Sequence, residues 1–533
     1  MAVRDGRGDV KQTTTGFRDP RHHICQKQIP IPNGMFAFAL YDQTKKSFFL
    51  VRDRAGEKPI FYSLTNSELR FSSELKGLMA DSNVSRHIDT DAMDCYLAMG
   101  FVPGERCILQ GVNKLPPAHA LEFNLENVET RLWCYWQLPQ IDTNPIPEQV
   151  DDAQLLDELE VLMEDSVKRQ LVADVPVGIL LSGGVDSSLV TALAVRSIPN
   201  VKTFTVRFPG HEEYDETKHA RLIAHHFATK HVELEADDSA VELLPLLAKQ
   251  FDEPMVDSSM IPTYLVSRLI CEECTVALGG DGGDELFGGY EHYKRLLLLN
   301  EKSKRIPLKI RKSISFAASK MLPLGFKGRN WLQCLSVDLN NDLPLISSLF
   351  DSIARIKLMQ KRDTWSLKAE GIREQGLPET DELLQRATRM DFANYLPEDI
   401  LVKVDRSSML NSLEVRSPLL DYRIIEFAFG RVPSRLKASS SQRKILLKNL
   451  AKKLLPPKFD LKRKHGFSIP LAEWLKNGPF RNLFHDVLLD SNCTFDRNSV
   501  FALLRGQDRG RQNSERLFAL VIFELWRREY NIC

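Results

Sequence analysis

Two short glycine-rich passages hold the residues most able to do chemistry. The first reads SGGVDSS, from Ser182 to Ser188, directly after the apolar run GILL. Glycine lets the backbone turn tightly and approach a ligand closely, and a helix that begins there exposes unpaired N–H groups. The passage therefore predicts a phosphate cup, with Gly183 and Gly184 in the turn and added hydroxyl donors on Ser182, Ser187 and Ser188.

Asp186 is the odd member of this passage, because a carboxylate repels phosphate unless a cation lies between them. Mg²⁺ prefers one or two carboxylates together with phosphate oxygens. We therefore predict that Asp186 holds Mg²⁺ against a nucleotide. The spacing differs from GxxxxGK[ST] and the loop has no lysine, so it does not indicate a γ-phosphate cradle of that kind.

The second passage, GGDGGDELFGGY, follows the apolar run TVAL. Gly279 and Gly280 predict backbone lying against a ligand, while Asp281, Asp284 and Glu285 supply acids. Each passage comes after a strand-like run, as loops do at the ends of parallel strands. We expect the two loops to hold opposite sides of one nucleotide.

The elements that must position these loops follow from periodicity. An apolar side chain recurs every four residues from Leu155 to Leu171, which predicts a helix. GILL (178–181), TFTVRF (203–208) and TVAL (275–278) predict strands of a parallel α/β sheet, and the chain beyond Tyr293 has helical spacing. Short aromatic runs from Asn33 predict an antiparallel sheet. The predicted organisation is an unrecognised and disordered segment 1–32, an antiparallel domain 33–138, a proline-rich linker 139–153 and an α/β domain 154–533.

Composition narrows the class of protein. The 533 residues contain 71 Lys+Arg and 71 Asp+Glu, so no overall charge attracts nucleic acid or an anionic membrane, and neither partner is expected. No apolar run is long enough to span a membrane. Nine cysteines in this length favour reduced thiols and a cytoplasmic location, and the CxxC at Cys271 and Cys274 is interpreted as a packed helix end.

The SGGVDSS loop resembles the PP-loop of ATP pyrophosphatases, which cleave between the α and β phosphates. With the second passage, the chain resembles the glutamine-dependent asparagine synthetases over about residues 33–530. Further matching segments are DVPVGILLSGGVDSS, FDEPMVDSSMIPTYLVS (251–267), LPEDILVKVDRSSMLNSLEVRSPLLD (396–421) and KRKHGFSIPLAEWL (462–475). The resemblance implies an antiparallel glutaminase layer of the Ntn type, then a PP-loop domain with a helical C-terminal region.

The resemblance also implies roles for particular residues. Adenine would lie near Leu181 and Val206, with the Gly279 and Gly280 backbone beside the nucleotide. Asp186 and Asp284 match the pair that binds Mg²⁺ on pyrophosphate, and Asp281 lies where many members have Glu, beside the reacting acyl group. The phosphate-contacting lysine of the family aligns with Arg443, and Lys444 is one step on, so either could make that contact.

The implied reaction uses ATP, Mg²⁺, aspartate and either ammonia or glutamine. The aspartate β-carboxylate attacks the α-phosphorus, giving β-aspartyl-AMP and pyrophosphate, and ammonia then displaces AMP. Asp281 is the candidate base or acceptor near the nitrogen; a metal or turn role is its alternative. Members of the family often pair through the glutaminase half, so a homodimer is a weak expectation.

The glutaminase half departs from the family pattern. Members begin Met-Cys-Gly and use the N-terminal cysteine as nucleophile, whereas here Ala2 follows Met1. Cys25 is internal and lacks a free α-amine. We therefore expect a truncated glutaminase layer and ammonia as the nitrogen source for this sequence, explained by a start placed too far downstream, a disrupted gene or an ammonia-dependent relative.

Two other functions stay open at this stage. One is a ligase or cyclase of the same architecture that acts on another carboxylate, such as a surface sugar or a secondary metabolite. The other is a non-catalytic paralogue, which we would expect to have lost Asp186 or Asp284; both are present.

Overall fold

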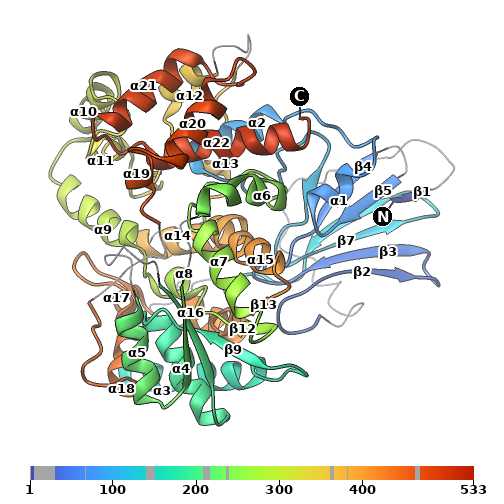
Figure 1. Cartoon of the computed structure of the whole chain (residues 1–533), viewed down its shortest axis with the longest axis vertical. Coiled ribbons are helices and arrows are strands. Elements are labelled where there is room, and N and C mark those ends of the chain that lie inside the picture. The colour runs from blue at the N-terminus through green and yellow to red at the C-terminus, as the bar shows by residue number, and fades with distance from the viewer. Residues whose placement is uncertain are drawn as a thin grey trace.

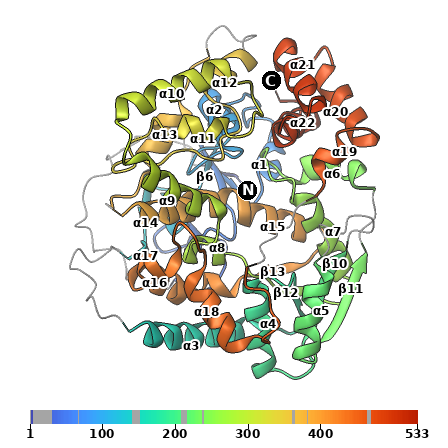
Figure 2. The same cartoon turned by 90° about the vertical axis from the view of Figure 1, so that its left-hand side faces the viewer.

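The computed structural model describes residues 2–4, 31–65, 68–139, 151–207, 216–235, 239–359, 365–380, 382–462 and 469–532. They form an antiparallel N-terminal half, a parallel sheet with covering helices, and a helical region (Figures 1 and 2). Across these ranges, no helix is long and apolar enough to cross a membrane. The predictions made for Cys25, for linker residues 140–150 and for residues 463–468 lie outside the described residues.

Two antiparallel sheets build the N-terminal half, with strand orders β1-β5-β4-β6 and β2-β3-β7-β8. The strands are β1 (Ala2–Arg4), β2 (Ala37–Asp42), β3 (Ser47–Arg52), β4 (Phe61–Thr65), β5 (Glu68–Ser72), β6 (Asn113–Lys114), β7 (His119–Asn124) and β8 (Thr130–Cys134). Apolar side chains of both sheets meet in one buried cluster that includes Leu50, Tyr62 and Phe123. Helices α1 (Leu75–Met79) and α2 (Thr90–Met99) complete this half.

Ala2–Arg4 is the part of residues 1–30 that the structure describes, and it pairs antiparallel with β5 as an edge strand. Three residues are too few to show an alternating pattern, so the sequence did not predict this strand. The disorder predicted for the rest of the segment lies outside the described residues.

A five-stranded parallel sheet of order β11-β10-β9-β12-β13 forms the centre of the second half. Its strands are β9 (Val177–Leu180), β10 (Lys202–Arg207), β11 (Lys230–Glu235), β12 (Val276–Leu278) and β13 (Glu414–Arg416). The first helices are α3 (Asp152–Gln170), α4 (Val185–Ser197), α5 (Thr217–His226), η2 (Ser239–Glu242), α6 (Leu243–Gln250), α7 (Met260–Ile270) and α8 (Gly283–Phe287). The predicted parallel sheet is confirmed; β11 and β13 were not foreseen.

Alternation along the strands places apolar side chains on both faces of this sheet. Ile179 and Leu278 pack with α3, α4 and α18 (Ile445–Leu454) in one cluster. Phe204 and Ala277 pack with α6 and α7 in another. Layers of helix therefore cover both faces, as parallel sheets require. Among the described residues, this covering leaves the ends of the strands as the expected place for a ligand.

The helical region follows the second glycine-rich passage. Its elements are α9 (Glu291–Ser303), α10 (Leu308–Met321), α11 (Arg329–Cys334), α12 (Ser352–Leu358), α13 (Ala369–Gln375), α14 (Leu383–Met390), the π-helical η3 (Asp391–Ile400), α15 (Leu401–Met409), η4 (Pro418–Leu420), α16 (Tyr422–Gly430), α17 (Ser434–Lys437), α18 (Ile445–Leu454), α19 (Leu471–Trp474), α20 (Pro479–Leu489), α21 (Arg497–Asp508) and α22 (Ser514–Glu529). Pro397 lies inside η3, where its missing N–H is compatible with the wider π turn.

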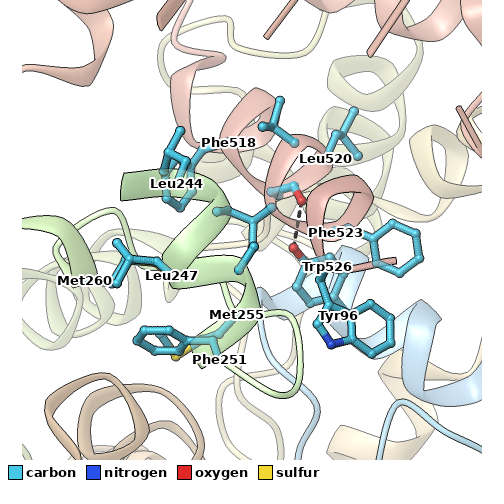
Figure 3. Close-up of a cluster of buried hydrophobic side chains, with 14 of the residues drawn as sticks. Tyr96, Leu244, Leu247, Phe251, Met255, Met260, Phe518, Leu520, Phe523 and Trp526 are labelled. Carbon is cyan, nitrogen blue, oxygen red and sulfur yellow. Dashed lines mark hydrogen bonds between the residues drawn. The ribbon is translucent and has the colours of Figure 1, made fainter. Parts of the chain in front are cut away.

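A large apolar cluster joins the two halves of the chain (Figure 3). Tyr96 of α2 packs against Phe523 of α22, and its hydroxyl donates to the Ala519 carbonyl oxygen at 2.7 Å. Trp526 of the same helix donates its indole N–H to the Asp252 carbonyl oxygen at 2.6 Å. The C-terminal helix thus fastens the N-terminal half to the parallel-sheet half.

Candidate active site at the carboxyl ends of β9 and β12

The candidate site lies where the strand order of the parallel sheet reverses. The chain runs from β9 outward to β10 and β11, then crosses back to β12 on the other side of β9. β9 and β12 pair in parallel with Leu278 opposite Ile179, so their following loops start at nearly the same level. A crevice outside the carboxyl ends of strands is expected at such a switch point.

The first loop has the geometry of a phosphate cup. Gly183 has φ 71°, and a Cβ on it would lie 2.6 Å from the His219 Cβ. Gly184 caps α4, and its N–H donates to Ser182 Oγ at 3.3 Å. Ser182 Oγ and Ser187 Oγ are 3.0 Å apart. Two hydroxyls and the start of a helix therefore converge as the sequence predicts.

The second loop packs directly on the first. A Cβ on Gly280 would lie 2.9 Å from the Asp186 Cβ, and one on Gly283 would lie 2.8 Å from Asp186 Oδ1. Gly279 anchors the loop by donating its N–H to the Arg416 carbonyl oxygen of β13 at 2.8 Å. The two passages, far apart in sequence, face each other because glycine allows the close approach.

Lys444 joins the two loops. Its Nζ contacts the Asp186 carboxylate and lies 2.9 Å from Asp284 Oδ1. Burial by itself lowers the pKa of Lys444, but the two carboxylates outweigh it and hold the pKa above its ordinary value. The ammonium therefore stays charged between the two acids that the sequence assigns to Mg²⁺.

The backbone at Lys444 is unusual as well. Its φ of 52° is left-handed, which costs a residue with a side chain roughly 1–2 kcal/mol. Its N–H donates to the Gly288 carbonyl oxygen, and its carbonyl accepts from Lys448 in the first turn of α18. Left-handed residues of this kind concentrate at functional sites, where the surroundings hold them in place.

Arg443, the other predicted cation, points elsewhere. Its Nη1 forms a salt bridge with Glu291 Oε2 at 2.9 Å, at the start of α9. Arg443 still lines the cavity described below, but the contact with the two aspartates belongs to Lys444. The sequence left this choice open because the two cations are neighbours.

Asp281 follows Gly280 in the second loop and lies beside a cluster of charged groups. Burial raises the pKa of its carboxyl, the Lys403 ammonium lowers it in part, and Asp186 raises it further. Lys403 of α15 pairs with Asp257 Oδ2 at 3.0 Å. Asp257 in turn accepts hydrogen bonds from the Ser259 N–H and hydroxyl. A carboxylate with a raised pKa is suited to accept a proton.

Glu285 lies on α8, the short helix that follows Asp281. Burial raises the pKa of its carboxyl to about 8, with Asp284 adding to the rise and the Tyr290 hydrogen bond opposing it. The Tyr290 hydroxyl donates to Glu285 Oε1 at 2.6 Å. The ring of Tyr290 stacks on His292.

One cavity of about 970 Å³ contains nearly all the predicted site residues. Its lining includes Leu181, Ser182, Gly183, Gly184, Asp186, Ser187, Val206, Gly279, Gly280, Asp281, Asp284, Arg443 and Lys444. Ser188 is the exception: its side chain is fully buried and absent from the lining. Each helical step turns about 100°, so when Ser187 faces the loop Ser188 faces the core. Ser188 is therefore not available as a hydroxyl donor to a ligand.

The donor set fits Mg²⁺. Asp186 and Asp284 converge on a single cationic group, so both can reach one ion. Two protein carboxylates leave the remaining positions to phosphate oxygens and water, which is the usual arrangement for this ion. Among the described residues, no group of three or more His, Cys, Asp or Glu could hold a metal by itself. The CxxC lies elsewhere, with Cys271 at the end of α7 and Cys274 buried.

The sequence patterns did not reveal a second group of residues that lines the cavity. Asp257, Ser258, Ser259, Tyr395 and Lys403 also line the cavity. The signal was present, because the segments 251–267 and 396–421 both match the family pattern and both contain lining residues. Neither segment has glycine spacing that would mark it as a ligand loop.

Comparisons with known proteins agree with this geometry. The family model described as Asparagine synthase matches residues 158–528, and the one described as Glutamine amidotransferase domain matches residues 22–136. Asparagine synthetase (glutamine-hydrolyzing) 1 of Bacillus subtilis (strain 168) is 29% identical over 511 residues, covering 95% of this chain and 79% of the relative. A putative asparagine synthetase (glutamine-hydrolyzing) of Mycobacterium bovis is 30% identical over 527 residues, covering 97% and 79%. Asparagine synthetase B of Escherichia coli (strain K12) is 29% identical over 283 residues, covering 49% and 44%. The chain belongs to the asparagine synthase family of carbon–nitrogen ligases, with a glutamine amidotransferase domain in its N-terminal half.

Proposed function

We propose that the chain makes asparagine from aspartate, ATP and ammonia by way of β-aspartyl-AMP. The observation that carries the proposal is the meeting of the two glycine-rich loops at β9 and β12, with Asp186, Asp284 and Lys444 at their contact. A site of this kind would hold a triphosphate across two adjacent strand ends.

The first step is an attack of the aspartate β-carboxylate oxygen on the α-phosphorus of ATP. The bond to the β-phosphate oxygen breaks, and pyrophosphate leaves. Mg²⁺ held by Asp186 and Asp284 would offset the charge of the phosphate oxygens. Ser182 and Ser187 donate hydroxyls to phosphate, and Lys444 supplies the positive charge next to the leaving group.

The second step is an attack of ammonia on the acyl carbon of the intermediate. The nitrogen becomes positively charged, loses a proton to the Asp281 carboxylate, and AMP leaves with the electrons of the C–O bond. Burial of Asp281 supports this role, because the raised pKa brings it closer to that of a useful base. Ammonia is the attacking species whether it is supplied free or released from glutamine.

The test incubates the protein with ATP, Mg²⁺ and aspartate, and with either ammonia or glutamine. We expect pyrophosphate, AMP and asparagine in equal amounts with ammonia. Asp186→Ala should abolish all three while circular dichroism shows an unchanged fold; normal turnover in that variant would refute the site. Asparagine formed in the glutamine arm would show that the chain also releases ammonia from glutamine.

A different acceptor is the second candidate. Pyrophosphate release without asparagine would show that the nucleotide chemistry is present but that the carboxylate belongs to another molecule. No product in any arm would favour a non-catalytic paralogue.

A further inference from the structure

The strongest unexplained feature outside the site is the surface around α10. Between Lys302 and Val337 the chain has nine Lys and Arg and no Asp or Glu, although the whole protein has no net charge. Figures 1 and 2 place α10 at the outer edge of the molecule, away from the parallel sheet. A neutral total therefore conceals one strongly cationic surface.

Two of the nine cations serve the fold. Arg311 turns inward and donates to the carbonyl oxygens of Leu335 and Val337. Arg329 is buried, pairs with Asp351 and donates to the Leu322 carbonyl oxygen. The other seven are exposed, and none of them forms a salt bridge within the described part of the chain: Lys302, Lys304, Arg305, Lys309, Lys312, Lys320 and Lys327.

Large apolar side chains are exposed among these cations. Phe316 is 62% exposed and Met321 80%, while Ile310 and Phe326 are each about half exposed. On α10, Lys309, Lys312, Phe316 and Lys320 recur at three- and four-residue steps, so they share the outer face. The inner face is made by Ser315 and Ala318, which are buried. Lys320 Nζ lies 4.6 Å from the Phe316 ring centre.

We propose that this surface, the outer face of α10 with Met321, Phe326 and Lys327, binds the headgroup region of an anionic phospholipid bilayer. Cations on the surface attract the negative headgroups, and apolar tips enter the boundary between headgroup and acyl chain. The helix lies flat on such a surface and does not need to span it. Binding of this kind would bring the ligase to a membrane without altering its active site.

Charge and side-chain type favour this partner over others. A second copy of the chain docking the same face would set cations against cations. The phosphates of a nucleic acid would pair with the lysines, and its bases could stack on the ring of Phe316. Ile310 and Met321 have no ring on which a base could stack, so a nucleic acid leaves them without a role. A lipid surface uses both the cations and all four apolar side chains.

The test is cosedimentation with vesicles. Vesicles of phosphatidylcholine with about 30 mol % phosphatidylserine should bind the protein at least roughly tenfold better than pure phosphatidylcholine, and less well as salt rises. K309E/K312E/K320E should lose roughly tenfold in binding. F316S/M321S should also bind more weakly but keep the salt dependence.

A matched control separates this surface from net charge. K168E/K230E/K452E changes three exposed lysines on other elements by the same total charge and should bind as the unaltered protein does. Equal loss in both triple variants, or equal binding to neutral vesicles, would overturn the proposal. So would tighter binding to single-stranded RNA than to vesicles, or a change of oligomeric state in K309E/K312E/K320E by analytical ultracentrifugation. Pyrophosphate release should be the same in all variants, which shows that each one is folded.

Discussion

Side-chain direction decides which of two adjacent cations reaches the glycine-rich loops. Lys444 and Arg443 are adjacent, yet only Lys444 reaches Asp186 and Asp284. Its left-handed backbone turns the side chain toward the loops, whereas Arg443 pairs with Glu291. At this scale the contact with the two aspartates is a property of one residue and not of the positively charged pair.

Replacing Lys444 by Met should lower pyrophosphate release at least about a hundredfold, because the phosphate charge loses a preorganised partner. Arg443→Gln should cost much less, since its partner Glu291 lies at the start of α9. Steady-state rates of pyrophosphate release at saturating ammonia compare the two variants with the unaltered protein. A larger loss in the Arg443 variant would reverse the assignment.

Asp281→Asn separates the two chemical steps. The amide cannot accept the proton from ammonia, so asparagine formation should fall about a hundredfold or more. Exchange of labelled pyrophosphate into ATP in the presence of aspartate needs only the first step and should persist. Loss of exchange as well would assign Asp281 to the metal or to the turn.

Lys437 is a buried cation outside the site. Its side chain is fully buried, with Nζ 4.4 Å from the Phe429 ring centre, and no described group accepts a hydrogen bond from it. Burial lowers the pKa of Lys437 from 10.5 to about 7, with Arg389 adding to the effect. The folded protein therefore keeps this amine neutral over a range in which the unfolded chain is protonated.

Between about pH 7 and pH 10.5 the unfolded state binds more protons at Lys437, so the free energy of unfolding should rise with pH. Lys437→Met should remove that rise and stabilise the protein at pH 7 by roughly 1–4 kcal/mol. Urea unfolding at several pH values measures both effects. An unchanged slope would show that the amine is solvated or paired.

At the scale of elements, glycine sets how closely the two loops can approach. Gly280 lies against Asp186 and Ser187, and a Cβ added to it would lie 2.9 Å from the Asp186 Cβ and 3.2 Å from the Ser187 nitrogen. The loops follow adjacent parallel strands, so their separation is set by the strand spacing and by these contacts.

Gly280→Ala should therefore push the loops apart and weaken ATP binding about tenfold or more, while the fold persists. Gly371→Ala is the control, because a Cβ there meets nothing within 4 Å and its φ is ordinary. Titration with ATP measures the nucleotide affinity of both variants. Equal ATP affinity in the two would show that the loops yield without loss.

Across the whole molecule, buried charges join the N-terminal half to the ligase half. Lys114 of β6 pairs with Glu253 at 3.1 Å and Glu398 of η3 at 2.5 Å, and donates to the Val102 carbonyl oxygen. Lys58 pairs with Asp405 of α15, the helix that also carries Lys403.

The limits of the domains, the formation of a homodimer and the cytoplasmic location of the protein stay predictions.

Lys114→Met should leave Glu253 without its cation and Glu398 with the longer pair to Arg52 at 3.9 Å, and should destabilise the protein by about 3–5 kcal/mol. Lys46→Met is the control, since its pair with Glu126 is exposed and should matter little. Urea midpoints at neutral pH compare the two. Similar midpoints would mean that the buried network is not needed to join the halves.

The sequence by itself predicted the two glycine-rich loops and the parallel sheet, because glycine spacing, carboxylate position and strand periodicity are local, and its resemblance to known proteins indicated the family. The ligand roles of Asp186, Gly280 and Asp281 rest on these signals and stay predictions. Only the tertiary structure decided between Arg443 and Lys444, turned Ser188 into the core and brought Asp257 and Lys403 to the cavity. These depend on contacts such as the one between Asp186 and Lys444, 258 positions apart, which no local pattern encodes.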